Sequence, residues 1–229
     1  MDLDKTYCMD CLEGLKLLED DSIDLVVTDP PYNLKKDFEN DDLTEEQYVE
    51  FLSPIMSELA RVIKPKRSVI IFFDAGKKMP LFWKCLFNSD LIFQKCGFLY
   101  KDNDESFPHN RILRKSEAWM VCSKTPELNH DGESYISDVL IFNYGHLERE
   151  WYHPTAKNIK AIRALVKSHS VQNEVVLDPF MGSGTTALAA QQLRRHFIGF
   201  EINPEFMKVI KLRLEQKSLP NIFEAISND

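Results

Sequence analysis

Short apolar runs alternate along this chain with segments in which apolar residues recur every three or four positions. Ile23, Leu25, Val26 and Val27 are too few for a helix and include several β-branched residues, which is typical of a buried strand in a parallel sheet. On this basis strands are predicted at 6–8, 23–27, 68–73, 91–93, 97–100, 118–122, 174–177 and 197–201, where 91–93 and 97–100 are two short strands or one broken strand. Helical spacing predicts helices at 11–19, 44–62, 77–87, 159–166, 187–195 and 205–217. The alternation indicates an α/β fold, a mostly parallel twisted sheet with helices on both faces.

Two local signals set the bounds of the longest predicted helix. Thr44-Glu-Glu-Gln47 has the form of a capping box, in which two side chains satisfy backbone N–H groups at the helix start. Lys64-Pro65-Lys66 is expected to end this helix, because proline cannot continue it. Residues 101–115 are polar and regular patterning is weakest from 124 to 150, so 101–150 is expected to be a loop region or an insertion within one domain spanning 1–229.

The composition is that of an ordinary globular chain with an acidic surface. Of its 229 residues, 44% are apolar and 28% are charged, which is enough for one sizeable core. A net charge of −8 argues against a surface that binds nucleic acid all over. Contacts to DNA would have to come from local basic clusters, which are Lys35 with Lys36, Lys77 with Lys78, and Arg111 with Arg114 and Lys115.

Cysteine usage and the lack of long apolar runs indicate a soluble, cytoplasmic protein. The five dispersed cysteines, an odd number, are expected to be reduced thiols. Cys8 and Cys11 have metal-ligand spacing, but neither a second cysteine pair nor a nearby histidine completes four ligands, so no metal is predicted. No run approaches the ~20 apolar residues of a membrane span, so no membrane association is expected.

The predicted strand at 23–27 is followed at once by Asp29-Pro30-Pro31-Tyr32. Neither proline can donate a ladder hydrogen bond, and each restricts the residue before it, so the strand must stop and the motif must be rigid. Ligands bind at the carboxyl ends of strands in open α/β sheets. There the Asp29 carboxylate and the Pro30 carbonyl could each accept one N–H of an exocyclic amine, while Tyr32 stacks on a base taken out of its duplex. The alternative is a strand terminator followed by a turn.

A second motif follows the predicted strand at 174–177. Residues 178–185, Asp-Pro-Phe-Met-Gly-Ser-Gly-Thr, form a glycine-bearing turn between a strand and a helix, and the next strand ends in Glu201. Glu201 lies about 20 residues after Gly182, the separation at which an acid holds ribose hydroxyls in nucleoside-binding βαβ units. The turn lacks the lysine of a P-loop and the third glycine of a dinucleotide fingerprint. Two interpretations of this motif remain. It binds an adenosine ligand without a phosphate, or it is a purely structural turn and Glu201 is solvated.

Three motifs, in their order along the chain, resemble the β group of DNA amino-methyltransferases: Asp29-Pro-Pro-Tyr32, His153-Pro-Thr155-x-Lys157 and Asp178-Pro-Phe-x-Gly-Ser-Gly-Thr185. The resemblance covers nearly the whole chain. It implies a Rossmann-like methyltransferase fold with a circularly permuted motif order, in which the catalytic half precedes the cofactor half. It also implies S-adenosylmethionine as cofactor, double-stranded DNA as partner, and 101–150 as the target-recognition region. A homodimer would be consistent with the lack of a large recognition domain.

The resemblance assigns roles to individual residues. The catalytic residues that it implies are Asp29, Pro30, Pro31 and Tyr32. The cofactor loop comprises Asp178, Pro179, Phe180, Gly182, Ser183, Gly184 and Thr185, with Glu201 on the ribose. The remaining cofactor contacts are Asp10 and Cys11 at the adenine end, Thr155 and Lys157 at the methionine tail, and Asp29. Where the family usually has Gln and Pro beside that lysine, this chain has Ala156 and Asn158.

The expected reaction is direct methyl transfer from S-adenosylmethionine to N6 of a flipped-out adenine in DNA, without a covalent intermediate. Adenine is favoured by resemblance, because cytosine-N4 members more often carry serine where this chain has Asp29. Cytosine-N4 methylation stays open as an alternative, as does methylation of RNA or of a protein amide by the same tetrapeptide. Outside enzymes, the alternative is a non-catalytic module that senses the cofactor or binds DNA.

Overall fold

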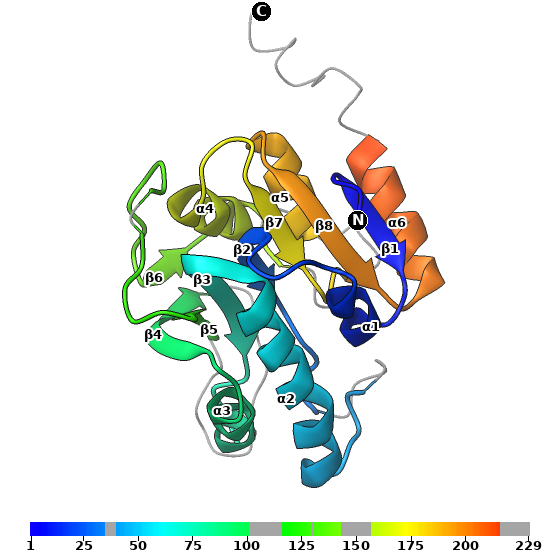
Figure 1. Ribbon diagram of the computed structural model, residues 1–229, viewed down its shortest axis with the longest axis vertical. Helices are drawn as coiled ribbons and strands as arrows, with labels where there is room; N and C mark the ends of the chain where they lie inside the picture. The colour runs from blue at the N-terminus through cyan, green and yellow to red at the C-terminus, as the bar shows by residue number, and fades with distance from the viewer. Residues whose placement is uncertain (35–39, 101–115, 130, 143–156, 216–229) are drawn as a thin grey trace, which may run out of the picture.

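The computed structural model describes residues 1–34, 40–100, 116–129, 131–142 and 157–215 as a sheet between two layers of helices (Figure 1). The sheet order is β1-β8-β7-β2-β3-β5-β4-β6. The strands are β1 (Lys5–Cys8), β2 (Ile23–Thr28), β3 (Ile63–Phe73), β4 (Ile92–Tyr100), β5 (Ser116–Ser123), β6 (Val139–Ile141), β7 (Val175–Asp178) and β8 (His196–Glu201). The helices are α1 (Cys11–Lys16), α2 (Glu45–Val62), α3 (Met79–Phe87), α4 (Ile159–His169), α5 (Thr185–Gln192) and α6 (Pro204–Glu215).

Helices cover both faces of the sheet, as the sequence predicts (Figure 1). One apolar core joins α1, α2 and α3 to the sheet through residues such as Leu15, Tyr48 and Phe82. A second core joins α4, α5 and α6 to the opposite face, through residues such as Leu165 and Ile210. Every residue of β2 is buried, because a central parallel strand is covered on both sides. The predicted α/β fold with a mostly parallel sheet is therefore confirmed.

Strand directions bring distant parts of the chain to one edge of the sheet. Among the described strands, β5 runs antiparallel to its neighbours β3 and β4, and the other neighbouring pairs are parallel. The strands β7 and β8, from the end of the chain, lie between β1 and β2, from its beginning. The carboxyl ends of β1, β8, β7, β2 and β3 consequently lie side by side.

The structure corrects three details of the sequence prediction and decides a fourth, namely whether 91–93 and 97–100 are two strands or one. Residues 64–66 belong to β3 instead of separating a helix from a strand, because the register shifts between the Ile23–Ile63 pair and Leu25–Ser68 and accommodates the proline there. The runs at 91–93 and 97–100 are one strand, β4, with an irregularity after Phe93. The helix α1 ends at Lys16, and β6 is a three-residue strand too short to leave a pattern. The predicted capping box of α2 is confirmed.

The range 101–150 is not a loop or insertion throughout. Its residues 116–123 form β5, an inner strand of the sheet, and residues 139–141 form β6 at the edge. The sequence pattern already marked 118–122 as a strand, and β5 extends it at both ends. Residues 101–115, 130 and 143–150 lie outside the described part of the chain, so the prediction of a target-recognition region rests on them.

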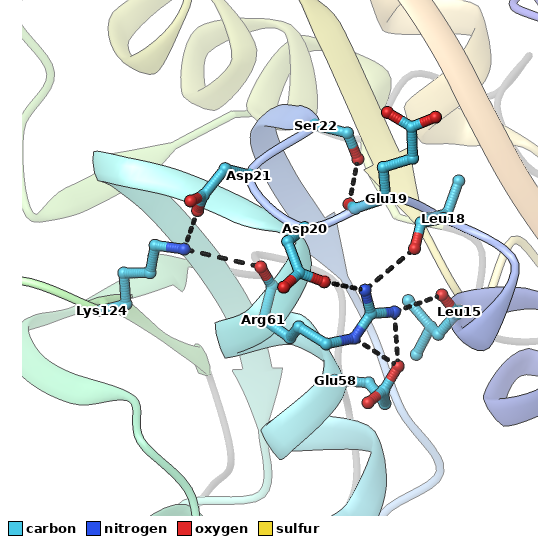
Figure 2. Close-up of polar contacts among 9 residues, drawn as sticks. All are labelled: Leu15, Leu18, Glu19, Asp20, Asp21, Ser22, Glu58, Arg61 and Lys124. Atoms are coloured by element: carbon cyan, nitrogen blue, oxygen red, sulfur yellow. Dashed lines mark hydrogen bonds and ion pairs between the residues drawn. The ribbon is translucent and has the colours of Figure 1, made fainter.

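Arg61, near the end of α2, ties α2 to the end of α1 (Figure 2). Its guanidinium donates hydrogen bonds to the carbonyl oxygens of Leu15 and Leu18, each at 2.9 Å. The same group pairs with Glu58 at 2.7 Å and with Asp20 at 2.6 Å. Carbonyl groups in the last turn of a helix have no partner within the helix. Arg61 therefore adds a donor to the Leu15 carbonyl, which also accepts the Leu18 N–H at 3.0 Å, and supplies one to the Leu18 carbonyl just beyond α1, a helix of 6 residues.

Replacing Arg61 with Met is expected to lower the free energy of unfolding by about 1–3 kcal/mol, because two carbonyl groups and Glu58 lose their donor. The contact with Asp20 adds little, since that side chain is 74% exposed. Urea denaturation would measure the change. The matched control is Lys16→Met, whose pair with Glu13 is largely exposed and whose loss should shift the unfolding free energy by less than about 0.5 kcal/mol. Equal midpoints for the two variants would contradict this account of Arg61.

Candidate functional site

Acidic residues stand at the carboxyl ends of five neighbouring parallel strands. Glu201 and Asp178 are the last residues of β8 and β7. Asp29 and Asp74 follow directly after β2 and β3, and Asp10 follows β1 by two residues. A row of carboxylates along one edge creates a negative potential that favours a positively charged ligand. This edge is the one at which open α/β sheets bind ligands.

Asp29, Glu117 and Lys157 meet at this edge and are called the charged cluster below. The Lys157 ammonium donates to Asp29 Oδ2 and, at 2.7 Å, to Glu117 Oε1. The Tyr32 hydroxyl donates to Asp29 Oδ1 and lies 3.4 Å from Glu117 Oε1. The ammonium also lies 5.0 Å from the centre of the Phe72 ring, a distance at which a cation is attracted to the ring. The predicted catalytic motif, residues 29–32, is therefore in direct contact with Lys157, the lysine of the predicted motif at 153–157.

Burial and mutual attraction set the protonation of this group. Burial raises the pKa of Asp29, although the Lys157 ammonium opposes the shift. Burial disfavours the charged form of Lys157, but the Asp29 and Glu117 carboxylates outweigh it and raise the pKa of the ammonium. Burial, followed by the two carboxylates, raises the pKa of the Tyr32 phenol. Lys157 is therefore cationic and Tyr32 is protonated at neutral pH.

Neighbouring segments hold residues 29–32 in place. The Tyr48 hydroxyl, from α2, donates to the Pro31 carbonyl oxygen at 2.9 Å. Asn33 adopts a left-handed backbone with φ of 58°, and its side chain bonds to both the N–H and the carbonyl of Leu43, at 2.8 and 2.9 Å. Tyr32, Tyr48, Asp74, Lys78 and Phe82 line a narrow depression beside the motif, which has no room for a water molecule. Rigid polar groups therefore hold the motif in one conformation.

The glycine turn, residues 178–185, is hydrogen-bonded to the end of β8. Gly182 and Gly184 have φ of 51° and 78°, a conformation that other residues adopt only with strain. The Gly182 N–H donates to Glu201 Oε2 at 2.7 Å, and the Asn203 N–H donates to Oε1 at 2.9 Å. Each carboxylate oxygen has a second lone pair, so Glu201 can also accept hydrogen bonds from a ligand.

Arg213, from α6, supports the same turn and was missed by the sequence analysis. It donates to the Ser183 carbonyl at 2.6 Å, to the Ser183 hydroxyl at 2.8 Å and to the Thr185 hydroxyl at 3.1 Å. Arg213 is buried, and helical spacing places it on the same face of α6 as Ile210 and Leu214. A charged residue on an otherwise apolar helix face is the signal that could have identified it.

A direct hydrogen bond joins the two predicted motifs. The Thr28 hydroxyl, at the end of β2 and next to Asp29, donates to Asp178 Oδ1 at 2.9 Å. Asp178 also accepts the Phe180 N–H at 3.0 Å. Asp29 and the glycine turn therefore begin at the ends of paired strands, β2 and β7. Segments separated by 150 positions in the sequence form one site.

The remaining predicted cofactor residues lie on both sides of this centre. The Asp10 carboxylate caps α1 by accepting the N–H groups of Leu12 and Glu13 at 2.9 and 3.1 Å. Cys11 is buried, and this burial raises the pKa of its thiol to about 12. Phe180 packs its ring edge against Phe51, with ring centres 6.1 Å apart. Pro179 lies within the glycine turn.

Some of the predicted residues cannot be placed. Thr155 and the basic residues 35, 36, 111, 114 and 115 lie outside the described residues. The basic residue Lys78 is described and lies 3.8 Å from Glu45. Asn158, which departs from the family pattern, caps α4 by accepting the Lys160 N–H at 2.9 Å. In the described ranges, no three His, Cys, Asp or Glu side chains gather in a way that could hold a metal ion.

The N6/N4 methyltransferase family, described as "DNA methylase", matches residues 23–212 of this chain. The chain belongs to this DNA methylase family. Type II methyltransferase M.HpaI of Haemophilus parainfluenzae is 31% identical over 93% of this chain and 74% of its own length. DNA adenine methyltransferase YhdJ of Escherichia coli K12 is 26% identical over 91% of this chain and 82% of its own length. The methylase therefore shares most of its length with enzymes that modify DNA.

Solved structures support the fold of the methylase. PvuII DNA methyltransferase, described as cytosine-N4-specific, aligns with a TM-score of 0.78 and 22% identity over 95% of this chain and 87% of its own. M1.HpyAVI, solved as a complex with S-adenosylmethionine, aligns with a TM-score of 0.70 and 25% identity over 92% of this chain and 98% of its own. Membership in the family confirms the expectation of S-adenosylmethionine as cofactor. Across the described residues, no helix is both long and apolar enough to cross a membrane.

Asp178 gives the stability of the methylase a distinct pH dependence. Burial raises its pKa to about 7, against hydrogen bonds from Thr186, Phe180 and Thr28. The folded protein therefore holds a proton that the unfolded chain releases near pH 4, and this contribution to stability is lost as the pH rises to about 7. The variant Asp178→Asn cannot ionise. Its free energy of unfolding, relative to the wild type, should rise by about 1–3 kcal/mol between pH 5 and pH 8 in urea titrations. A difference that does not change with pH would contradict the burial of an ionisable Asp178.

Proposed function

We propose that this DNA methylase transfers a methyl group from S-adenosylmethionine to N6 of an adenine flipped out of double-stranded DNA. The observation that carries the proposal is the hydrogen bond between Thr28 and Asp178, at 2.9 Å. It joins the end of the strand that carries Asp29 to the start of the glycine turn. A cofactor at the turn and an amine at Asp29 would therefore be neighbours, as a direct transfer requires.

The residues on the edge of the sheet suit this cofactor. When bound, S-adenosylmethionine supplies an electrophilic methyl group on a positively charged sulfur. Glu201, beside its bonds to Gly182 and Asn203, could accept hydrogen bonds from ribose hydroxyls, Asp10 and Cys11 lie beyond it at the end of β1, and Asp178 could face a cationic tail. The row of acids favours a cation and disfavours phosphate. The cofactor would lie along the ends of β1, β8 and β7, as in a nucleoside-binding βαβ unit.

Residues 29–32 suit an exocyclic amine. Asp29 and the Pro30 carbonyl would accept its two N–H bonds, and this would turn the nitrogen lone pair toward the methyl group. The ring of Tyr32 would stack on the base. A carboxylate beside the nitrogen also stabilises the positive charge that develops there during transfer. Tyr48 and Asn33 keep the motif in one conformation, so little reorganisation is needed.

The order of elements supports membership in the β group. The strand β2 and its motif precede β7, the glycine turn and β8 in the chain, yet they adjoin β7 in the sheet. This order supports the proposal of a circularly permuted methyltransferase in one domain spanning 1–229. The described parts of β4 and β6 end, and β5 begins, at the same edge as Asp29. The described strand ends that flank residues 101–115, and the end of β6, therefore lie at the site edge, which is compatible with the proposal that 101–150 contains the target-recognition region. A homodimer would enlarge the surface available to DNA.

The test is to incubate the purified protein with unmethylated bacterial genomic DNA and S-adenosylmethionine carrying an isotopic methyl group. The DNA is then digested and its nucleosides are separated by mass spectrometry. The proposal predicts labelled N6-methyladenine. Labelled N4-methylcytosine would contradict adenine as the target base but would still support methyl transfer to an exocyclic amine of DNA. Label in an equal amount of RNA but not in duplex DNA would contradict the proposed substrate.

A further inference from the structure

The Asp29 carboxylate is already engaged on both of its oxygens. Oδ1 accepts the Tyr32 hydroxyl, and Oδ2 accepts the Lys157 ammonium. Each oxygen has a second lone pair, but an amine that approaches along the direction held by Tyr32 or by Lys157 must displace that donor before Asp29 can accept it. Tyr32 is held close by the short loop that it shares with Asp29. Lys157 comes from a distant segment, just before α4, so it is the donor that can move away.

Glu117, on β5, offers the second position for that donor. Its Oε1 lies 2.7 Å from the Lys157 ammonium, and both side chains are nearly buried, at 11% and 9% exposure. A buried ammonium that left Asp29 without another carboxylate would lose several kcal/mol of stabilisation. With Glu117 already bound to it, Lys157 can release Asp29 Oδ2 and remain paired.

We propose that Glu117 is a positioning residue, which retains the Lys157 ammonium while Asp29 turns to the exocyclic amine of the target base. This inference rests on the proposed function, since it needs Asp29 as the acceptor of that amine. Glu117 does not touch the base. It acts through Lys157 and through the charge of the cluster.

The charge of the cluster is the second part of the argument. Asp29 and Glu117 carry two negative charges and Lys157 carries one positive charge, which leaves a net charge of −1. During transfer the nitrogen lone pair forms the bond to the methyl carbon, while the electrons of the broken carbon–sulfur bond stay on sulfur. The nitrogen is then positive until one of its protons passes to the Asp29 carboxylate. A cluster of charge −1 stabilises that cation in a site shielded from water.

Removing the charge of Glu117 would make the cluster neutral. The amide oxygen of Gln could still accept a hydrogen bond from Lys157, but Asp29 would be the carboxylate that attracts the ammonium, and the acceptor of the amine would stay occupied. If the ion pair between Glu117 and Lys157 were only structural, removing the charge of Glu117 would lower stability without a specific loss of turnover. Turnover and cofactor binding therefore have to be measured separately.

The test compares Glu117→Gln with Glu117→Asp in methyl transfer to DNA. Gln keeps the size of Glu117 and removes its charge, and kcat should fall about 100-fold while KM for S-adenosylmethionine changes less than about 3-fold. Asp keeps the charge and should retain kcat within about 10-fold of the wild type. The matched control is Glu174→Gln, because Glu174 is a similarly buried glutamate that pairs with Arg67 at the amino end of β7. Its kcat should equal that of the wild type.

A folded Glu117→Gln protein with kcat within about 3-fold of the wild type would overturn the inference. So would equal losses in the Gln and Asp variants, since charge would then be irrelevant. If the Gln variant does not fold, the Asp variant decides: retained turnover supports the role, and a loss as large as that of Asp29→Asn refutes it. Failure of the proposed function is a separate result, in which the wild-type protein itself puts no methyl group on a base of DNA.

Discussion

Replacing Asp29 with Asn is expected to lower kcat for methyl transfer about 100- to 1000-fold while S-adenosylmethionine still binds. Asn has nearly the same size as Asp, but it exchanges an anionic acceptor for a neutral amide. The amine of the base would lose the charge that stabilises the developing cation. Lys157 would also lose one of the two carboxylates that it contacts. Single-turnover kinetics and equilibrium binding of S-adenosylmethionine, measured on the same preparation, separate the two effects.

Asp24 provides a matched control for Asp29. Asp24 is a buried aspartate of β2, the strand that ends just before Asp29. It pairs with Lys64 at 2.6 Å and accepts the Val175 N–H at 2.9 Å. It lies near the amino end of β2, away from the site edge. Asp24→Asn should therefore lower stability and leave kcat near the wild-type value. Wild-type turnover in the Asp29 variant would show that this carboxylate does not hold the amine.

Replacing Lys157 with Met should lower the free energy of unfolding by about 3–5 kcal/mol at pH 8, because two largely buried carboxylates would lose the cation that they share. Asp29 and Glu117 would then face each other as like charges, and one of them would take up a proton at a raised pKa. An acid whose pKa is raised on folding destabilises the protein more as the pH rises. The loss should therefore be smaller at pH 5 than at pH 8, as measured by urea denaturation.

Lys64 is the matched control for Lys157. It too pairs with a buried aspartate, Asp24, but its side chain is 40% exposed. Lys64→Met should cost about 1 kcal/mol, because water screens the pair and can replace part of it. If both lysine variants lost the same small amount at every pH, the charged cluster could not be the tightly coupled group described above.

The sequence predicted the strands best where the sheet is buried on both faces. The residues of β2, β7 and β8 are mostly apolar because helices cover both of their sides. Each strand ends in an acid or is followed directly by one, and parallel pairing then places those acids side by side. The site edge was therefore predictable from local pattern together with the general direction of parallel strands.

Partners that come from distant segments were not predictable in this way. Glu117 begins an apolar strand and has no local motif, and only the pairing of β5 with β3 brings it to Lys157, 40 positions away. Arg213 reaches the glycine turn through the packing of α6. The strand β6, of three residues, is too short to carry a period. These features depend on tertiary packing, which a local pattern does not encode.

The most direct test is a crystal structure of the protein with S-adenosylhomocysteine and a DNA duplex that contains a methylatable adenine. The account predicts a flipped adenine whose N6 amine donates to Asp29 and to the Pro30 carbonyl, with the thioether sulfur of the cofactor product facing that nitrogen from the glycine turn. A base held with its amine away from Asp29, or a cofactor product bound away from residues 178–185, would contradict it.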